Sequence, residues 1–284
     1  MPWYRLAGQD FYFPGPIPEL APFENSALDA APSPASVPAP LALICQTVGW
    51  VAGEQRQVET WSAPPGFRLR VAGGSDFYIS PAGQIRLCTG PEQDKASLNE
   101  TDRLILLGPV LVLALALRST WCLHASAALF RQALLAFLGE SGQGKSTLAG
   151  SLAAEDWRRV ADDILPVTLE GGDLIAWPRF PQLKLPVQAP AGPGLPERLL
   201  IRTICVLTDV PADALPALQL LPVDQAIQAW LSHTAGTRMF GPGLLARHLA
   251  FCTQAAGRLP VYRLDYPHRW DALARIKGLL ESIC

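Results

Sequence analysis

Short apolar runs separated by glycine and proline occupy residues 41–87 and predict a small antiparallel β-module. Each run has the length that is typical of a strand rather than a helix. Proline and glycine between the runs supply the backbone angles that tight turns need. The predicted strands are Leu41–Val48, Phe67–Val71, Phe77–Ser80 and Gln84–Leu87, with turns at 64–66, 73–74 and 81–83.

Eight prolines fall within residues 14–40. Proline has no amide donor and fixes its own backbone, so this stretch is expected to form neither a helix nor a central strand. An extended surface loop is the simplest interpretation, and a proline-rich ligand for another domain is an alternative.

A charge-free apolar run, Leu104–Leu117, is 14 residues long. A membrane-spanning helix needs about 20 such residues, and a Gly-Pro pair at 108–109 also interrupts the run. The pattern therefore predicts a buried helix over residues 101–118 and no membrane segment. Thr101 and Asp102 are residue types that cap the start of a helix.

Composition and charge limit the classes of protein to which the chain can belong. The chain has 284 residues, a net charge of −2 and only 17% charged residues, which fits one large or two modest domains. The near-neutral balance argues against a nucleic-acid-binding protein, which usually carries a basic patch. Residues 1–100 carry six basic and ten acidic groups and contribute −4, whereas the rest contributes 17 − 15 = +2. This change of sign supports a division near residue 100.

The six cysteines form no C-x-x-C pair and none has a histidine at zinc spacing. The first residues show no basic segment followed by an apolar stretch, so they do not resemble a signal peptide. We therefore expect a cytoplasmic protein with reduced, buried thiols.

A glycine-rich segment that follows two apolar runs carries the clearest chemistry. Leu123–Phe130 and Ala133–Leu138 predict a hairpin or two adjacent strands of a buried sheet. The sequence Gly-Glu-Ser-Gly-Gln-Gly-Lys-Ser-Thr follows at 139–147 and matches the phosphate-binding loop G-x-x-x-x-G-K-S/T. Residues 148–154 then predict a helix, so the expected strand–loop–helix context is complete.

Each residue type in this loop has a physical role. Glycines permit the curl that turns amide N–H groups toward a phosphate, and a helix N-terminus favours an anion. Lys145 would add a cation on the β and γ phosphates, and Ser146 would offer a hydroxyl to Mg²⁺. An accidental glycine-rich turn is the alternative. The predicted nucleotide-binding residues are Gly139, Ser141, Gly142, Gln143, Gly144, Lys145, Ser146 and Thr147.

Two adjacent carboxylates, Asp162 and Asp163, lie 17 and 18 residues beyond Lys145, at the end of a short strand near 159–161. Only one helix fits in the interval, so both carboxylates are predicted near the phosphate site. One could hold Mg²⁺ while the other accepts a proton from an attacking hydroxyl. A solvated acidic turn is the alternative.

His124 begins the strand that precedes the loop strand. A histidine there could orient a base or contact the γ phosphate, although a structural histidine is the alternative.

The combination of L-H-A-S-A, F-L-G-E-S-G-Q-G-K-S-T-L and V-A-D-D-I resembles the HPr serine kinase/phosphorylase family over about residues 121–167. The resemblance is closest to the short, kinase-only relatives of bacterial peptide-modification clusters, including kinases of lasso-peptide precursors. It implies that Lys145 and Ser146 bind phosphate and Mg²⁺, and that His124, Asp162 and Asp163 form the catalytic centre. The chain lacks the second signature of the bifunctional enzymes, which argues against the reverse phosphorylase reaction and against HPr as substrate.

The fold implied is α/β: a P-loop kinase core of the HPr kinase type over residues 101–284, preceded by a β-rich module over 1–100. Further strands are predicted at 201–208 and 261–264, a hairpin at 171–172 and a terminal helix at 270–280. Three basic residues could reach the phosphates, although an ordinary surface role is the alternative for each: Arg179, Lys184 and Arg238, the last in a segment, 231–238, that could form a lid.

The function expected is therefore an ATP- and Mg²⁺-dependent kinase that phosphorylates a serine hydroxyl of a peptide or protein, with a ribosomally made precursor peptide as one candidate. Ser146 and Asp163 would organise Mg²⁺, and Asp162 would accept the proton with help from His124, although the aspartates could exchange roles. A kinase of a small molecule such as serine, and a non-catalytic ATP-binding adaptor that recruits a peptide, are alternatives. The sequence leaves a homo-oligomer open.

Overall fold

A computed structural model describes residues 2–28, 37–51, 53–88, 98–153, 156–178, 180–181 and 195–284. The chain divides into two compact units, neither of which is one continuous stretch. The first comprises residues 1–120 and 236–246, and the second comprises 121–235 and 247–284. The division falls after Thr120, whereas the sequence predicted a boundary near residue 100. The apolar helix that follows residue 100 therefore belongs to the first unit.

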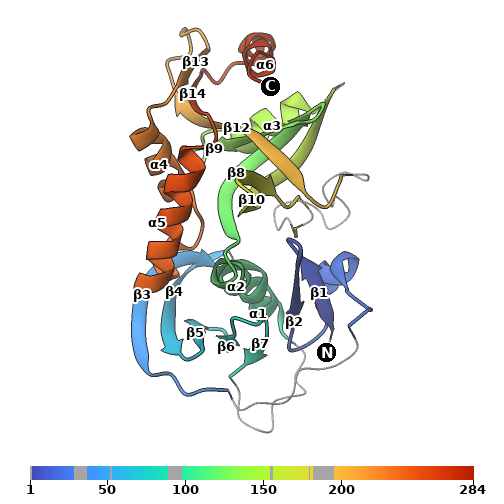
Figure 1. The fold of residues 1–284 in the computed structure, drawn as a ribbon, viewed down its shortest axis with the longest axis vertical. Helices are drawn as coiled ribbons and strands as arrows, with labels where there is room; N and C mark the ends of the chain where they lie inside the picture. The colour runs from blue at the N-terminus through green and yellow to red at the C-terminus, as the bar shows by residue number, and fades with distance from the viewer. Residues whose placement is uncertain are drawn as a thin grey trace. The chain divides into compact units, whose positions relative to one another are not determined.

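The first unit contains a five-stranded antiparallel sheet whose strands neighbour one another in chain order (Figure 1). The predicted β-module is confirmed. One strand was not predicted, because its buried Val58 and Thr60 alternate with charged and amide side chains and leave no apolar run. The strands are β3 (Ala42–Val51), β4 (Glu54–Ala63), β5 (Gly66–Val71), β6 (Asp76–Ile79) and β7 (Ile85–Leu87).

The N-terminal part of this unit is more ordered than its prolines predicted. β1 (Trp3–Leu6) and β2 (Gln9–Tyr12) form an antiparallel hairpin. A 3-10 helix, η1 (Pro18–Phe23), begins with proline, whose fixed φ suits a first helical position. Leu20 is fully buried, so part of the predicted surface loop belongs to the core.

The predicted apolar helix is present but interrupted. It consists of α1 (Glu100–Ile105), a π-helical segment η2 (Leu106–Val110) and α2 (Leu111–Leu117). The interruption coincides with Gly108 and with Pro109, which has no N–H to continue the helical hydrogen bonds. Among the residues that the structure describes, no helix is long and apolar enough to cross a membrane.

The start of this helix differs from the prediction. The cap is Asn99, whose side chain accepts a hydrogen bond of 2.8 Å from the backbone N–H of Asp102. The buried Asp102 carboxylate accepts instead from the backbone N–H and the hydroxyl of Ser75, at 2.8 and 3.0 Å. Asp102 therefore ties the helix to the turn before β6.

The second unit is built on a seven-stranded mixed sheet in the order β11-β10-β8-β9-β12-β14-β13 (Figure 1). The predicted pairing of the two runs before the glycine-rich loop is confirmed, since β8 and β9 form an antiparallel hairpin. β9, β12 and β14 run parallel, so their carboxyl ends meet at one edge of the sheet. The strands are β8 (Trp121–Phe130), β9 (Ala133–Leu138), β10 (Trp157–Glu170), β11 (Asp173–Ala176), β12 (Leu199–Asp209), β13 (Ala217–Leu220) and β14 (Val261–Tyr266).

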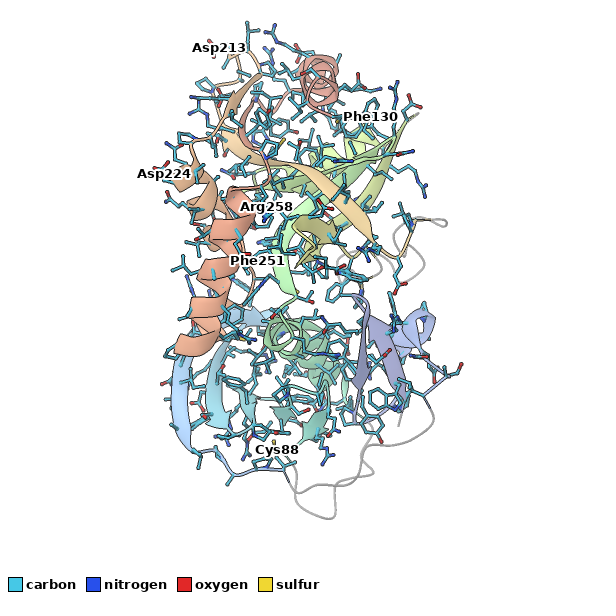
Figure 2. All side chains as sticks on the ribbon, viewed as in Figure 1. Cys88, Phe130, Asp213, Asp224, Phe251 and Arg258 are labelled. Atoms are coloured by element: carbon cyan, nitrogen blue, oxygen red, sulfur yellow. The ribbon has the colours of Figure 1, made fainter. Side chains whose placement is uncertain are left out.

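Helices pack against this sheet. α3 (Lys145–Leu152) and α6 (Leu273–Glu281) share one apolar core with strands β8, β9, β12 and β14. Two further helices, α4 (Val223–Ser232) and α5 (Pro242–Ala256), were not predicted. Phe251 of α5, labelled in Figure 2, meets the ring of Trp230 of α4 edge-on at 5.6 Å and lies 5.8 Å from the buried ring of Trp121 at the start of β8.

β10 is much longer than the short strand predicted near 159–161. It runs for 14 residues, so Asp162 and Asp163 lie within it and not at its end. A bulge between Arg159 and Ala161 interrupts its pairing with β8, and Asp163 has a φ of 101°, which is rare for a residue with a side chain. The predicted hairpin after it is confirmed, with positive φ at both Gly171 and Gly172.

All six cysteines are free thiols. Cys122, Cys205 and Cys252 are buried as expected, whereas Cys284 is exposed and the remaining two are intermediate. Burial raises the pKa of the Cys122 and Cys252 thiols to about 12.

Candidate active site

The glycine-rich loop connects β9 to α3, as the sequence predicted. The backbone N–H of Glu140 donates a hydrogen bond of 2.6 Å to Oε1 of Gln143, which closes the loop on itself. A Cβ on Gly139 would lie only 2.5 Å from that oxygen, and the φ of Gly139 is 153°. The motif glycine at this position is therefore required by the local geometry.

Lys145, the first residue of α3, is buried, with 7% of its surface exposed. Its Nζ donates to the carbonyl oxygens of Gly139 and Glu140, at 2.7 and 2.9 Å. The ammonium is thus held over the loop. Ser146 and Thr147 follow it in the first turn of α3 and are exposed, so their hydroxyls are open to a ligand at the helix N-terminus.

His124 of β8 and Asp163 of β10 contact one another. Their Nε2 and Oδ1 atoms lie 3.0 Å apart, and their side chains are 38% and 22% exposed. The antiparallel register of β8 and β9 brings this pair to the loop. Ser126 of β8 lies opposite Phe137 of β9. His124, two residues before Ser126, therefore lies level with Gly139, two residues after Phe137. The unusual φ of Asp163 is the kind of local strain that concentrates at functional sites.

Asp162 has a different environment from its neighbour. It is 5% exposed, its Oδ1 accepts a hydrogen bond of 3.0 Å from the hydroxyl of Ser126, and its Oδ2 forms an ion pair with Arg159. Both carboxylate oxygens are therefore engaged by protein groups. The two aspartates, equivalent in the sequence, are separated by the structure into a buried and a partly exposed carboxylate.

His233 is a site residue that the sequence did not single out. Its carbonyl accepts a hydrogen bond of 2.7 Å from the backbone N–H of His124. Burial lowers the pKa of its imidazole, as do Lys145 and His124, whereas Glu140 raises it. The side chain thus lies within electrostatic reach of both the loop and the His124–Asp163 pair. Its only signal in the sequence is that the chain has just four histidines.

The segment around His233 is not the free lid that the sequence suggested. The backbone N–H of Ala235 donates to the carbonyl of Cys122 at 2.7 Å, and Leu123 forms a bridge with Thr234. Residues 233–235 therefore extend the pairing of β8 beyond the end of the hairpin with β9.

For the three basic residues expected near the phosphates, the placement stays a prediction. Arg179 and Lys184 lie outside the described residues. Arg238 lies in a 3-10 helix, η3 (Thr237–Met239), of the first unit, whereas the loop and the His124–Asp163 pair belong to the second.

The side chains at the site can be compared with the ligands that the expected magnesium ion prefers. The described residues contain no group of three or more histidine, cysteine or acidic side chains that would form a complete protein cage. Mg²⁺ usually takes only one or two protein oxygens and completes its shell with phosphate oxygens and water. The exposed hydroxyl of Ser146 and the partly exposed carboxylate of Asp163 fit an ion held together with a nucleotide.

No family model matches the chain, and no curated protein does. Among solved structures the chain is similar to the Hpr(Ser) kinase/phosphatase from Coxiella burnetii, with 13% sequence identity and a TM-score of 0.34. The likeness covers 57% of this chain and 88% of that chain. At this TM-score it carries no argument about the fold or function of the chain.

Proposed function

We propose that the chain is an ATP- and Mg²⁺-dependent kinase, built on a P-loop core of the HPr kinase type, that transfers the γ-phosphoryl group to a hydroxyl. The contact between His124 and Asp163, level with the start of the glycine-rich loop, carries this proposal. This contact supports the proposal, because a carboxylate and an imidazole at that position could meet an acceptor hydroxyl beside a phosphate held by the loop.

The loop amides and Lys145 would hold the β and γ phosphates. Mg²⁺, when bound, supplies neutralisation of phosphate charge, and Ser146 would be its protein ligand beside phosphate oxygens and water. Phosphoryl transfer depends mainly on alignment and charge stabilisation, so these few groups are sufficient.

We assign proton acceptance to Asp163 in place of Asp162, which was first expected to take this role. Both oxygens of Asp162 are engaged by Ser126 and Arg159, and its carboxylate is buried. Asp163 contacts His124, and 22% of its side chain is exposed, so it is the more accessible of the two carboxylates. His124 would orient Asp163, whereas Asp162 would hold β10 against β8.

The sequence resemblance supports a serine of a peptide or protein as the acceptor, with a ribosomally made precursor peptide as the leading candidate. Mass analysis of the peptide encoded beside this gene, after incubation with ATP and Mg²⁺, tests this acceptor directly. A gain of one phosphate on a serine supports it. Phosphorylation of free serine or another metabolite in place of the peptide would support the small-molecule alternative.

Substitution of the two aspartates tests the assignment of roles. Asp163→Asn should lower kcat by about 100-fold or more, because general base catalysis contributes about 10²–10⁴. Its melting temperature should stay close to that of the wild type. Asp162→Asn should instead lower the free energy of unfolding by about 1–3 kcal/mol, because it weakens hydrogen bonds to a charged group.

Lys145→Ala serves as the reference for loss of phosphate binding and should abolish turnover while the fold is retained. Wild-type turnover in Asp163→Asn would refute the role assigned to it. ATP binding without a phosphorylated product from any peptide, protein or small hydroxyl acceptor would favour the non-catalytic adaptor instead.

A further inference from the structure

Two aromatic rings border the loop on the side of β14. A Cβ built on Gly144, whose φ is 79°, would lie 2.8 Å from Cε1 of Tyr266 and 3.3 Å from Cε1 of His268. Tyr266 is the last residue of β14, and His268 follows two residues later. Both rings therefore lie against the backbone of the residue that leads into α3.

The two rings differ in exposure. Tyr266 is 7% exposed and belongs to the apolar core below the loop, whereas the His268 side chain is 46% exposed. Their centroids are 4.7 Å apart, so the tyrosine supports the histidine from behind. His268 Nε2 lies 2.9 Å from Oδ1 of Asp209, which restrains the orientation of the imidazole.

The order of the strands separates this aromatic pair from the proposed transfer site. β9, which leads into the loop, lies between β8 on one side and β12 on the other. His124 and Asp163 come from β8 and β10 on the first side. Asp209 and Tyr266 end β12 and β14 on the second side. In sheets of this kind ligands bind in the crevice beyond the carboxyl ends of the parallel strands.

A nucleoside triphosphate held at the loop has two chemically distinct ends. Its terminal phosphate must face the acceptor, which the proposed function places at His124 and Asp163. Its flat base must then leave the loop elsewhere, and a supported, half-exposed aromatic ring is a stacking surface for any base. We propose that His268, backed by Tyr266 and oriented by Asp209, is the platform on which the nucleobase stacks. This inference rests on the proposed function, since it requires the loop to bind phosphates.

Two ligands that share the phosphates but differ in the base provide the test. Binding of ATP and of inorganic tripolyphosphate, each with Mg²⁺, is measured calorimetrically on the full chain and its variants. His268→Ala should raise the Kd for ATP about tenfold, because the variant loses the face on which the base stacks. The Kd for tripolyphosphate should not change. His268→Phe should restore ATP binding, because phenylalanine keeps a stacking face. This variant lacks the contact with Asp209.

Gln254→Ala, a neutral exposed position of α5, serves as the matched control and should bind both ligands as the wild type does. If the wild type binds neither ligand, the proposed function itself fails, and the inference with it. If the wild type binds both but His268→Ala keeps the full preference for ATP over tripolyphosphate, the inference alone fails. An equal loss of both ligands in His268→Ala would show that the ring supports the loop and does not bind the base, which also overturns it.

Discussion

In the glycine-rich loop, the residue type at a single position is determined by backbone geometry as much as by the chemistry of phosphate binding. Gly144 combines a left-handed φ of 79° with close contact to Tyr266 and His268, so two independent restrictions exclude a side chain. Gly150, six residues later in α3, has no atom within 4 Å of the position a Cβ would take. Gly150 therefore serves as a matched control for Gly144, which precedes the same helix.

Gly144→Ala should weaken ATP binding by more than about tenfold and lower the melting temperature. The new Cβ strains the backbone and displaces the Tyr266 ring, which together cost of the order of 1–3 kcal/mol. Isothermal titration with ATP and thermal unfolding measure the two effects.

Gly150→Ala should leave ATP binding unchanged and stabilise the protein by up to about 1 kcal/mol, because alanine is the better helix former. Equal effects of the two substitutions would contradict the loop geometry described above.

The position of the loop in the fold could be predicted from the sequence, because its strand–loop–helix pattern is contiguous. Lys145, His124 and the aspartate pair lie on or next to recognisable motifs, so their neighbourhood could be predicted. The sequence could not distinguish Asp162 from Asp163, because their difference arises from Ser126 and Arg159. Likewise His268 lies more than 120 residues after the loop, and only the parallel register of β9, β12 and β14 brings it there.

Among the elements, α5 contributes a buried polar cluster that supports the site. His248 Nε2 lies 2.9 Å from the hydroxyl of Thr234 and 3.2 Å from Sγ of Cys252, and its ring lies 4.9 Å from that of Trp121. Thr234 follows His233, whose carbonyl holds the backbone of His124. The cluster therefore fixes the segment that completes the pairing of β8.

This cluster predicts a specific dependence of stability on pH. Burial lowers the pKa of His248 to about 4 from an ordinary value of 6.5, so the imidazole is neutral in the folded state. Below pH 6.5 the unfolded chain gains a proton that the folded chain does not, and stability falls until about pH 4, by about 1.4 kcal/mol per unit.

Urea unfolding at pH 7 and pH 5 measures this effect by comparison with His248→Gln. The wild type should lose about 2 kcal/mol more than the variant between these values, because glutamine does not titrate. Cys252 does not interfere, since its raised pKa keeps the thiol neutral over this range. An identical pH dependence in the two proteins would show that His248 does not titrate as described.

The elements that the sequence predicted share one property: each has a clear apolar run or turn pair of its own. Helices α4 and α5 have no continuous apolar run; in α4 the buried residues Ala226, Ala229 and Trp230 are instead spaced along one face of the helix. The length of β10 was underestimated because Asp162, Asp163 and Pro166 look like the end of a strand, although antiparallel pairing with β8 continues through all three.

At the scale of the molecule, the low charged fraction of 17% is explained largely by fully covered elements. The apolar helix after residue 100 is the clearest case, since Leu111, Val112, Leu113, Ala114, Leu115 and Ala116 are all buried. A helix that is apolar all round must be covered on every side to be soluble. It belongs to the first unit, together with the β-module and residues 236–246.

The position of a truncation should therefore decide whether the remaining fragment folds. A fragment of residues 101–284 keeps the apolar helix but removes the five-stranded sheet of its unit, and each exposed leucine or valine loses about 1.5–3 kcal/mol of burial. We expect this fragment to aggregate, as measured by size-exclusion chromatography. A fragment of residues 121–284 lacks the helix and should remain soluble to a greater extent, although residues 236–246 lose their unit. If the 101–284 fragment is monomeric and unfolds cooperatively, the division between the units lies near residue 100. That result would contradict the division after Thr120.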